Sequence, residues 1–248
     1  SFSFDITDWI DTDKEEQDLT VRVTDPVNDE ALTRGKQSWT GKSEGIWYTN
    51  TTGIWQTVWL EYVPATYLKS VRFFPNIDSG DIRIKGIISG FVPNTEVTVN
   101  ISFKEQAVVT CTTTPETEEF SLTLNLFNNH IFRSGYHDQG WLWSPEFPNL
   151  FDVTLSVMPP NNDRSDQVSS YFGMREVRAE KGSIYLNNNP IYQKLVLDQG
   201  YWPDGLLTAP SDQAFRDDIE LAKSMGFNGA RLHQKVEDPR FLYWADKL

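Results

Sequence analysis

Two clusters of polar residues each follow an apolar strand near the C-terminal end of the chain. The first begins with Asp198 and Gln199, and the second contains Arg231, His233 and Gln234. Two strands joined by a crossover helix run parallel, so that both clusters emerge at the same, carboxyl-terminal edge of a sheet. That is the edge at which α/β proteins bind their ligands. The sequence therefore predicts a ligand site there, built from hydrogen-bonding and titratable side chains.

Carboxylates near this edge raise the question of acid–base catalysis. Asp198 together with Glu237 or Asp238 could form a pair of carboxylates for proton transfer. The alternative is that they bind a substrate by hydrogen bonds or cap a helix. Asp238 stands directly before Pro239, a pairing typical of a helix start, and this favours the second interpretation.

The elements that must position these residues form a strand, helix, strand, helix pattern. Ser211 stands where a helix N-cap belongs, and Gly226 stands where the helix should end. Apolar residues recur at helical spacing between them. The predicted elements are a strand at Ile191–Leu197, a helix at Asp212–Met225, a strand at Phe227–Leu232 and a helix at Arg240–Lys247.

The rest of the chain is predicted to be β-structure. Residues 1–64 contain three alternating segments, Phe2–Ile6, Leu19–Val23 and Thr57–Val63. Residues 65–178 contain enough strands for an immunoglobulin-like β-sandwich, and residues 179–190 suggest a hairpin with the turn Asn187–Pro190. The seven sandwich strands are expected at Leu68–Phe74, Ile82–Ser89, Glu96–Lys104, Ala107–Thr113, Glu119–Leu126, Phe151–Val157 and Ser169–Val177.

Composition excludes several classes of function. The 248 residues carry a formal net charge of −13, which argues against a nucleic-acid or anionic-membrane partner. No apolar run approaches the length of a membrane span. Cys111 is the only cysteine, which excludes a disulfide framework and favours a cytoplasmic location. His130 and His137 lie too far from other ligand types to suggest a metal site, and we expect neither a metal nor a cofactor.

Three motifs stand out in the chain: Thr52–Glu61 (TGIWQTVWLE), Leu142–Phe151 (LWSPEFPNLF) and Tyr171–Val177 (YFGMREV). They closely resemble signature blocks of glycoside hydrolase family 2, the family of β-galactosidases, β-glucuronidases and β-mannosidases. The blocks occur in the order found in the family, and the strand–helix–strand pattern at the C-terminal end resembles the opening of the family's barrel. The resemblance therefore extends over essentially the whole chain.

The resemblance implies a mainly β chain with a C-terminal α/β part. Residues 1–64 would be the end of a jelly-roll sugar-binding domain, 65–178 an immunoglobulin-like sandwich, and 179–248 the first βα units of a truncated (β/α)₈ barrel. Family members are retaining glycosidases that use two glutamates. Both glutamates would follow later barrel strands, beyond Leu248. We therefore expect an internal fragment with no catalytic residue, inactive alone, of an enzyme that hydrolyses β-linked sugars.

Candidate substrate-binding residues follow from the same resemblance. Arg231, His233 and Gln234 match a strand-end block that ends in a sugar-contacting histidine. Gln234 occupies the matching position here, and His233 comes one residue early, so that their roles stay open between substrate binding and structure.

Asp198 and Gln199 replace an arginine and a histidine of many relatives, and they suit neutral sugar hydroxyls. Trp202 could stack on a sugar ring or form loop core. The loop Trp47–Asn50 would lie near the barrel mouth, whereas Trp59 is expected in a core or an interface.

A different class of function also fits the composition. The chain could be a non-catalytic carbohydrate-binding or structural protein built on the same sandwich, with a natural end near Leu248. Measurable sugar affinity of the chain alone would favour that alternative. The sequence identifies neither the sugar nor the oligomeric state, and a homo-oligomer stays open.

Overall fold

The structure is a computed structural model that describes residues 2–129, 132, 140–160 and 164–248. His130 and His137 lie outside the described residues. The chain is mainly β, with antiparallel sheets and two α-helices in the described part. None of the helices described is both long enough and apolar enough to cross a lipid bilayer.

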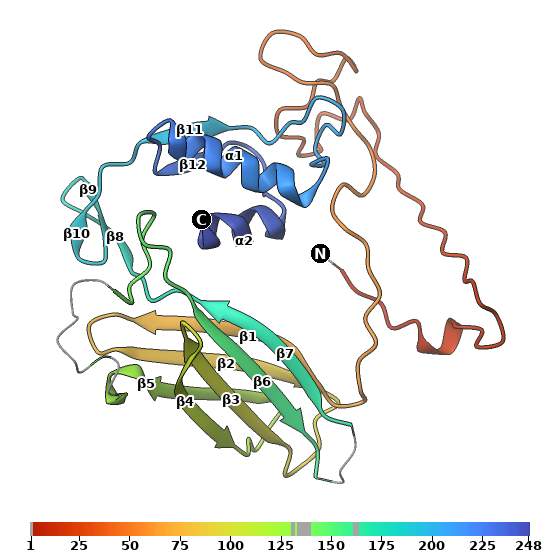
Figure 1. Cartoon of the computed structure of the whole chain (residues 1–248). Coiled ribbons are helices and arrows are strands. Elements are labelled where there is room, and N and C mark those ends of the chain that lie inside the picture. Colours follow the sequence, from red (N-terminus) through yellow and green to blue (C-terminus); the bar gives the residue numbers. More distant parts are fainter. Residues whose placement is uncertain (1, 130–131, 133–139, 161–163) are drawn as a thin grey trace.

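Two antiparallel sheets face each other in the middle of the chain (Figure 1). One has the strand order β1-β2-β5, and the other has the order β4-β3-β6-β7. The seven strands are β1 (Tyr67–Asn76), β2 (Asp81–Ser89), β3 (Glu96–Phe103), β4 (Gln106–Thr113), β5 (Glu119–Asn125), β6 (Phe151–Met158) and β7 (Asp166–Phe172). The first six agree with the sequence prediction to within about two residues. The seventh, predicted at Ser169–Val177, begins earlier and already ends at Phe172. A short 3₁₀-helix, η2 (Leu126–Asn128), follows β5.

Alternation along the strands builds one core between the two sheets. In β2, β3 and β6 every second residue is buried, as the period of two of a β-strand requires. Phe151 is fully buried and stacks on Phe103 and Phe172, with ring centroids 4.7 and 5.0 Å apart. Such offset aromatic pairs add to the stabilisation that comes from burial alone.

A small sheet connects this domain to the C-terminal part. It consists of β8 (Val177–Glu180), β9 (Ser183–Leu186) and β10 (Asn189–Pro190). Asn187 and Asn188 form the β9–β10 turn with φ angles of 50° and 66°, which asparagine tolerates better than most residues. The predicted hairpin is therefore present, but its turn has two residues because Asn189 and Pro190 already pair with β9.

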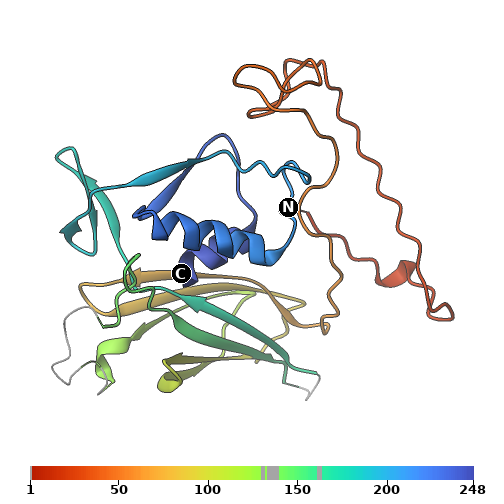
Figure 2. The same ribbon diagram turned by 45° about the horizontal axis from the view of Figure 1, so that its top comes forward.

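The C-terminal part has the predicted strand, helix, strand, helix order. It contains β11 (Leu195–Asp198), α1 (Asp212–Ser224), β12 (Gly229–Leu232) and α2 (Pro239–Lys247). β11 and β12 pair in parallel. The Ser211 side chain accepts a hydrogen bond from the amide of Ala214, and Asp238 accepts one from the amide of Arg240. Both helices therefore begin at the predicted caps, and Figure 2 shows them side by side above the sandwich.

Residues 2–64 differ from the prediction. The three segments Phe2–Ile6, Leu19–Val23 and Thr57–Val63 are not strands, and a 3₁₀-helix, η1 (Thr7–Trp9), is the only helix in this described region. A strand needs a neighbour to accept and donate its backbone hydrogen bonds, and none of these segments pairs with another. Their apolar side chains are correspondingly exposed: Trp59, expected in a core or an interface, is 66% exposed.

Helix α2 is fastened to the sandwich at its C-terminal end. The carboxylate of Asp246 accepts hydrogen bonds of 3.2 Å from the Tyr171 hydroxyl and from Nη1 of Arg175. Its backbone oxygen accepts a 2.6 Å bond from the indole of Trp143. Tyr243, from the same helix, packs edge-on against Tyr171. The C-terminal part therefore has a defined position relative to the sandwich.

Candidate functional site

The structure brings the two predicted polar clusters together at one sheet edge. Leu197 of β11 lies opposite Arg231 of β12, and Asp198 lies opposite Leu232. The amide of His233 donates a 2.8 Å hydrogen bond to the backbone oxygen of Asp198, which continues the pairing one residue beyond the strands. The expected parallel arrangement is confirmed.

The same register divides the predicted residues between two faces of the sheet. Neighbouring strand residues point to opposite faces, so that Arg231 shares a face with Leu197, and Asp198 shares the other with Leu232. Asp198 and Leu232 are half-buried, whereas Leu197 and Arg231 are exposed, so that Asp198 lies on the covered face. Burial, followed by the nearby charge of Asp198, raises the pKa of Asp218 on α1, which agrees with α1 being the element that covers this face. Arg231 and Asp198 therefore cannot bind one ligand from the same side.

Arg231 and His233 form a basic pair on the open face. Nη1 of Arg231 lies 3.1 Å from Nδ1 of His233. A guanidinium can only donate, so Nδ1 is the acceptor and the imidazole is neutral. Partial burial, followed by the charges of Arg231 and Lys36, lowers the pKa of His233. A neutral imidazole that accepts at Nδ1 carries its proton on Nε2, where it can donate to a ligand oxygen.

The other predicted residues lie in the loops around this edge. Gln199 is half-buried. Trp202 packs edge-on against Phe215 of α1, with ring centroids 5.9 Å apart, and its indole N–H is buried. Gln234 is exposed and has a φ of 59°. Its backbone oxygen lies so close to Gly35 that a side chain at position 35 would overlap it.

The N-terminal region also reaches this edge. Tyr48 stacks on Tyr201, which follows β11, with ring centroids 4.1 Å apart and an angle of 14° between the rings. Burial and the neighbouring Tyr48 raise the pKa of Tyr201. The loop Trp47–Asn50 therefore lies against the first loop of the α/β part.

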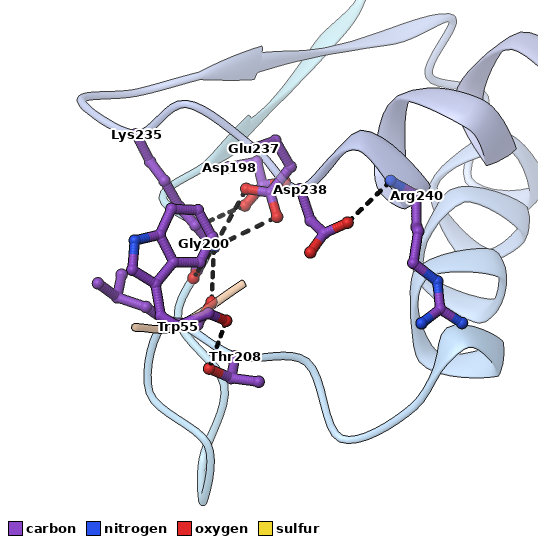
Figure 3. A network of polar contacts seen from close by, with 9 residues as sticks. Trp55, Asp198, Gly200, Thr208, Lys235, Glu237, Asp238 and Arg240 are labelled. Carbon is purple, nitrogen blue, oxygen red and sulfur yellow. Dashed lines mark hydrogen bonds and ion pairs between the residues drawn. The ribbon is translucent and has the colours of Figure 1, made fainter. Parts of the chain in front are cut away.

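Lys235 is the central residue that the sequence reasoning missed. Its ammonium group donates to the backbone oxygens of Gly200 and Leu207 and pairs with the carboxylate of Glu237 (Figure 3). The ring of Trp55 covers the ammonium, with 5.0 Å between Nζ and the ring centroid. Lysine is normally a surface residue. The only sequence signal was the opposite charge of Glu237 two positions later, which is too common to single it out.

The carboxylates of this region have structural partners. Burial and the charge of Asp198 raise the pKa of Glu237, while Lys235 opposes them. Asp198 accepts a 2.7 Å hydrogen bond from the amide of Gly200, and Asp238 caps α2. The capping alternative is thus confirmed for Asp238. No three His, Cys, Asp or Glu side chains come together as a metal site in the ranges that the structure describes.

Two cavities lie in the described part of the chain, and no residue of β11 or β12 lines either of them. A cavity of about 310 Å³ is lined by Trp55, Thr208, Phe215 and residues at the starts of both helices. A larger one of about 630 Å³ lies between the sandwich and the end of α2 and includes Trp143 and Arg175 in its wall. Neither is lined by Arg231 or His233.

Comparison with known proteins links this arrangement to one family. The model of "Glycosyl hydrolases family 2" matches residues 66–175. The chain is 26% identical to a putative β-glucuronidase from Formosa agariphila and 24% identical to a β-galactosidase from Thermoanaerobacter pseudethanolicus. Both alignments cover 100% of this chain, but only 28% and 32% of those proteins. The chain thus spans less than a third of the length of these relatives.

Solved structures show the same fold. The apo structure of Bacteroides uniformis β-glucuronidase 3 superposes with a TM-score of 0.62 and 22% identity, over 76% of this chain and 22% of that one. A β-glucuronidase from Parabacteroides merdae gives a TM-score of 0.61 at 18% identity, over 76% of this chain and 23% of that one. The matched model, the relatives and the fold agree with the resemblance of the three sequence motifs. Residues 66–175 match glycosyl hydrolases family 2, and the three comparisons together support a fragment of a protein of this family.

Proposed function

We propose that the chain is an internal part of a retaining β-glycosidase that hydrolyses O-glycosidic bonds of β-linked sugars. Such enzymes use two carboxylic acids about 5–5.5 Å apart, one as nucleophile and one as acid and base. The carboxylates near the sheet edge are engaged in helix capping, in the Lys235 pair or in the bond from the Gly200 amide. The catalytic pair would therefore come from parts of the protein outside these residues, and the chain alone would be inactive.

The proposal includes a domain assignment. Residues 65–178 would be the immunoglobulin-like sandwich, and residues 179–248 the entry and first two βα units of a (β/α)₈ barrel. Residues 1–64 would be the end of a jelly-roll domain, whose extended segments would pair with strands outside this chain. The exposed alternating side chains of these segments support that assignment.

One observation carries the proposed function: two parallel strands end side by side with hydrogen-bonding side chains, in a chain whose residues 66–175 match the model of this family. Arg231 and His233 would line the interior of the barrel and contact the sugar. Gln234 and Gln199 would contribute from the adjoining loops. Asp198 and Trp202 would act from the helix side and stabilise the first loop. The partner would be a carbohydrate. A cytoplasmic location and a homo-oligomer remain part of the proposal, the first supported only by the single cysteine.

The test compares this chain with the complete protein that carries it. The chain should release no chromophore from nitrophenyl β-glycosides, whereas the complete protein should do so and should first form the β-anomer, seen by proton NMR. His233→Ala in the complete protein should raise KM. Turnover by the chain alone, or an inverted first product, would refute the mechanism. Sugar affinity of the chain without hydrolysis by the complete protein would identify a carbohydrate-binding protein instead.

A further inference from the structure

The Lys235 ammonium is buried and enclosed by hydrogen-bond acceptors, although the residue lies in a loop. Its side chain is only 6% exposed, and that of Glu237 only 3%. The distances from Nζ are 2.6 Å to the Gly200 oxygen, 3.2 Å to the Leu207 oxygen and 3.2 Å to the Glu237 carboxylate. An ammonium group has three protons to donate, so these acceptors use its full capacity.

The acceptors belong to different segments. Gly200 and Leu207 lie in the loop between β11 and α1, and Glu237 lies in the loop between β12 and α2. Lys235 therefore joins the two loops that border the candidate sugar site.

A third segment, which contains Trp55 and is distant in sequence, covers the Lys235 ammonium. The ring of Trp55 lies over the ammonium at 5.0 Å, and the Trp55 backbone oxygen accepts a 2.9 Å hydrogen bond from the Thr208 hydroxyl. Figure 3 shows Trp55 and Thr208 on one side of the ammonium and Glu237 on the other. A cation–π contact is strongest when the cation is shielded from water. The burial of Lys235 provides that condition.

The backbone at Gly200 leaves space for the Lys235 side chain. Gly200 has a φ of 65°, and a side chain at this position would overlap Cδ and Nζ of Lys235 and approach a carboxylate oxygen of Glu237. Glycine at position 200 therefore serves both the left-handed conformation and the space for the ammonium. This is a second, independent sign that the loop and the lysine are fitted to each other.

We propose that Lys235 is a positioning residue that holds the Trp55 segment and the loop Gln199–Thr208 in a fixed place beside the ends of β11 and β12. The description of that place as a sugar site rests on the proposed function, but the fastening itself does not. Removal of the ammonium leaves two carbonyls and a buried carboxylate without their donor, which favours opening of the loop. A substitution of Trp55 should therefore loosen the loop that Lys235 holds, and a substitution of Lys235 should make Trp55 more accessible to solvent.

Two experiments on the 248-residue chain measure these two effects separately. Hydrogen exchange of the loop peptide 199–208 is followed by mass spectrometry in Trp55→Leu, because the amides of Trp202 and Leu206 are hydrogen-bonded within that loop. Exchange should accelerate about tenfold, the size expected for loss of a desolvated cation–π contact. Trp59→Leu is the matched control, because it removes an exposed tryptophan of the same segment, and its loop should exchange at the wild-type rate.

Acrylamide quenching of tryptophan fluorescence measures how a substitution of Lys235 affects Trp55. The difference between the emission of the chain and of its Trp55→Phe variant isolates Trp55 among the nine tryptophans. Lys235→Met should make Trp55 more accessible to the quencher, whereas Lys194→Met, at an exposed lysine, should not. Exchange of the β3 and β6 peptides reports whether each variant is folded.

Equal loop exchange in Trp55→Leu and Trp59→Leu would overturn the proposal, and this result stays decisive if Lys235→Met fails to fold. Unchanged quenching of Trp55 in a folded Lys235→Met variant would also overturn it. Neither readout uses a sugar or a turnover. Absence of glycosidase activity would therefore not refute the role of Lys235. Refutation of the role of Lys235 would likewise not refute the glycosidase activity.

Discussion

Replacement of Asp246 by asparagine should loosen α2 from the sandwich and lower the pKa of Tyr171. The substitution keeps the size of the side chain and removes its charge. It therefore breaks the ion pair with Arg175 and weakens the bond from the Tyr171 hydroxyl, both 3.2 Å long. The bond from Trp143 goes to the backbone oxygen of Asp246 and should survive.

The expected loss of stability is about 1 kcal/mol. The side chains of Arg175 and Asp246 are 43% and 28% exposed, so solvent screens the ion pair to about 0.5 kcal/mol. A hydrogen bond to a charged acceptor contributes about 1.5 kcal/mol or more when buried. Here the site is half-exposed and the asparagine oxygen still accepts, so that about 0.5 kcal/mol is lost from this bond.

Two assays follow the two effects. Urea unfolding gives the change in stability, with Asp204→Asn in an exposed loop as the control. Absorbance at 295 nm during an alkaline titration, minus that of Tyr171→Phe, gives the ionisation of Tyr171. Burial, followed by the charge of Asp246, raises the pKa of Tyr171 to about 12. The variant should titrate below the wild type but above an ordinary tyrosine, because the burial remains.

The sign of the pH dependence also follows. A raised native pKa means that the unfolded chain loses the phenol proton first, so stability falls as pH rises from about 10 to 12. That fall should be smaller in Asp246→Asn. An unchanged Tyr171 titration together with wild-type stability would refute the role assigned to Asp246.

Three further predictions concern the core, a cap and a buried carboxylate. Phe151→Ala should destabilise the sandwich by about 3–5 kcal/mol, because the ring is fully buried and stacked; a loss below about 1 kcal/mol in urea unfolding would contradict this packing. Ser211→Ala should cost about 1 kcal/mol through loss of the α1 cap, and Ser211→Gly only a few tenths, by the same assay. The native pKa of Glu237 is raised above its ordinary value of 4.5, so its proton stabilises the fold below that value and this contribution is lost as pH rises through the native pKa. The stability of the chain relative to Glu237→Gln should therefore decline from pH 4 to pH 7, and an increase over that range would refute the assignment.

Local patterns predicted the elements that are stabilised within this chain. Strict alternation identified β2, β3 and β6, and the caps Ser211 and Asp238 located the starts of α1 and α2, because the cap and the first turn are adjacent in sequence. Alternation failed in Phe2–Ile6 and Leu19–Val23, where the apolar pattern is present and no partner strand is. A hydrophobic pattern states which face a strand would bury, but pairing depends on what lies beside it.

The candidate site was predictable in position but not in detail. Parallel strands joined by a helix place Asp198 and His233 at one edge from topology alone. These two side chains lie on opposite faces of the sheet because Leu197 pairs with Arg231. The sequence does not fix that pairing, and a shift of one residue would exchange the faces. The role of Lys235 depends on Trp55, which lies far away in sequence, so that no local pattern contains it.

Strand order has a consequence for synthesis on the ribosome. β3 forms a hairpin with β4, which follows it directly, but its other edge pairs with β6, where Val97 meets Val157. Contacts this distant in sequence slow folding, and an unpaired edge invites association with other chains until it is covered. The nascent chain must therefore carry an open β3 edge until residues 151–158 have left the exit tunnel. β11, α1 and β12 have no such delay, because their partners follow within one crossover.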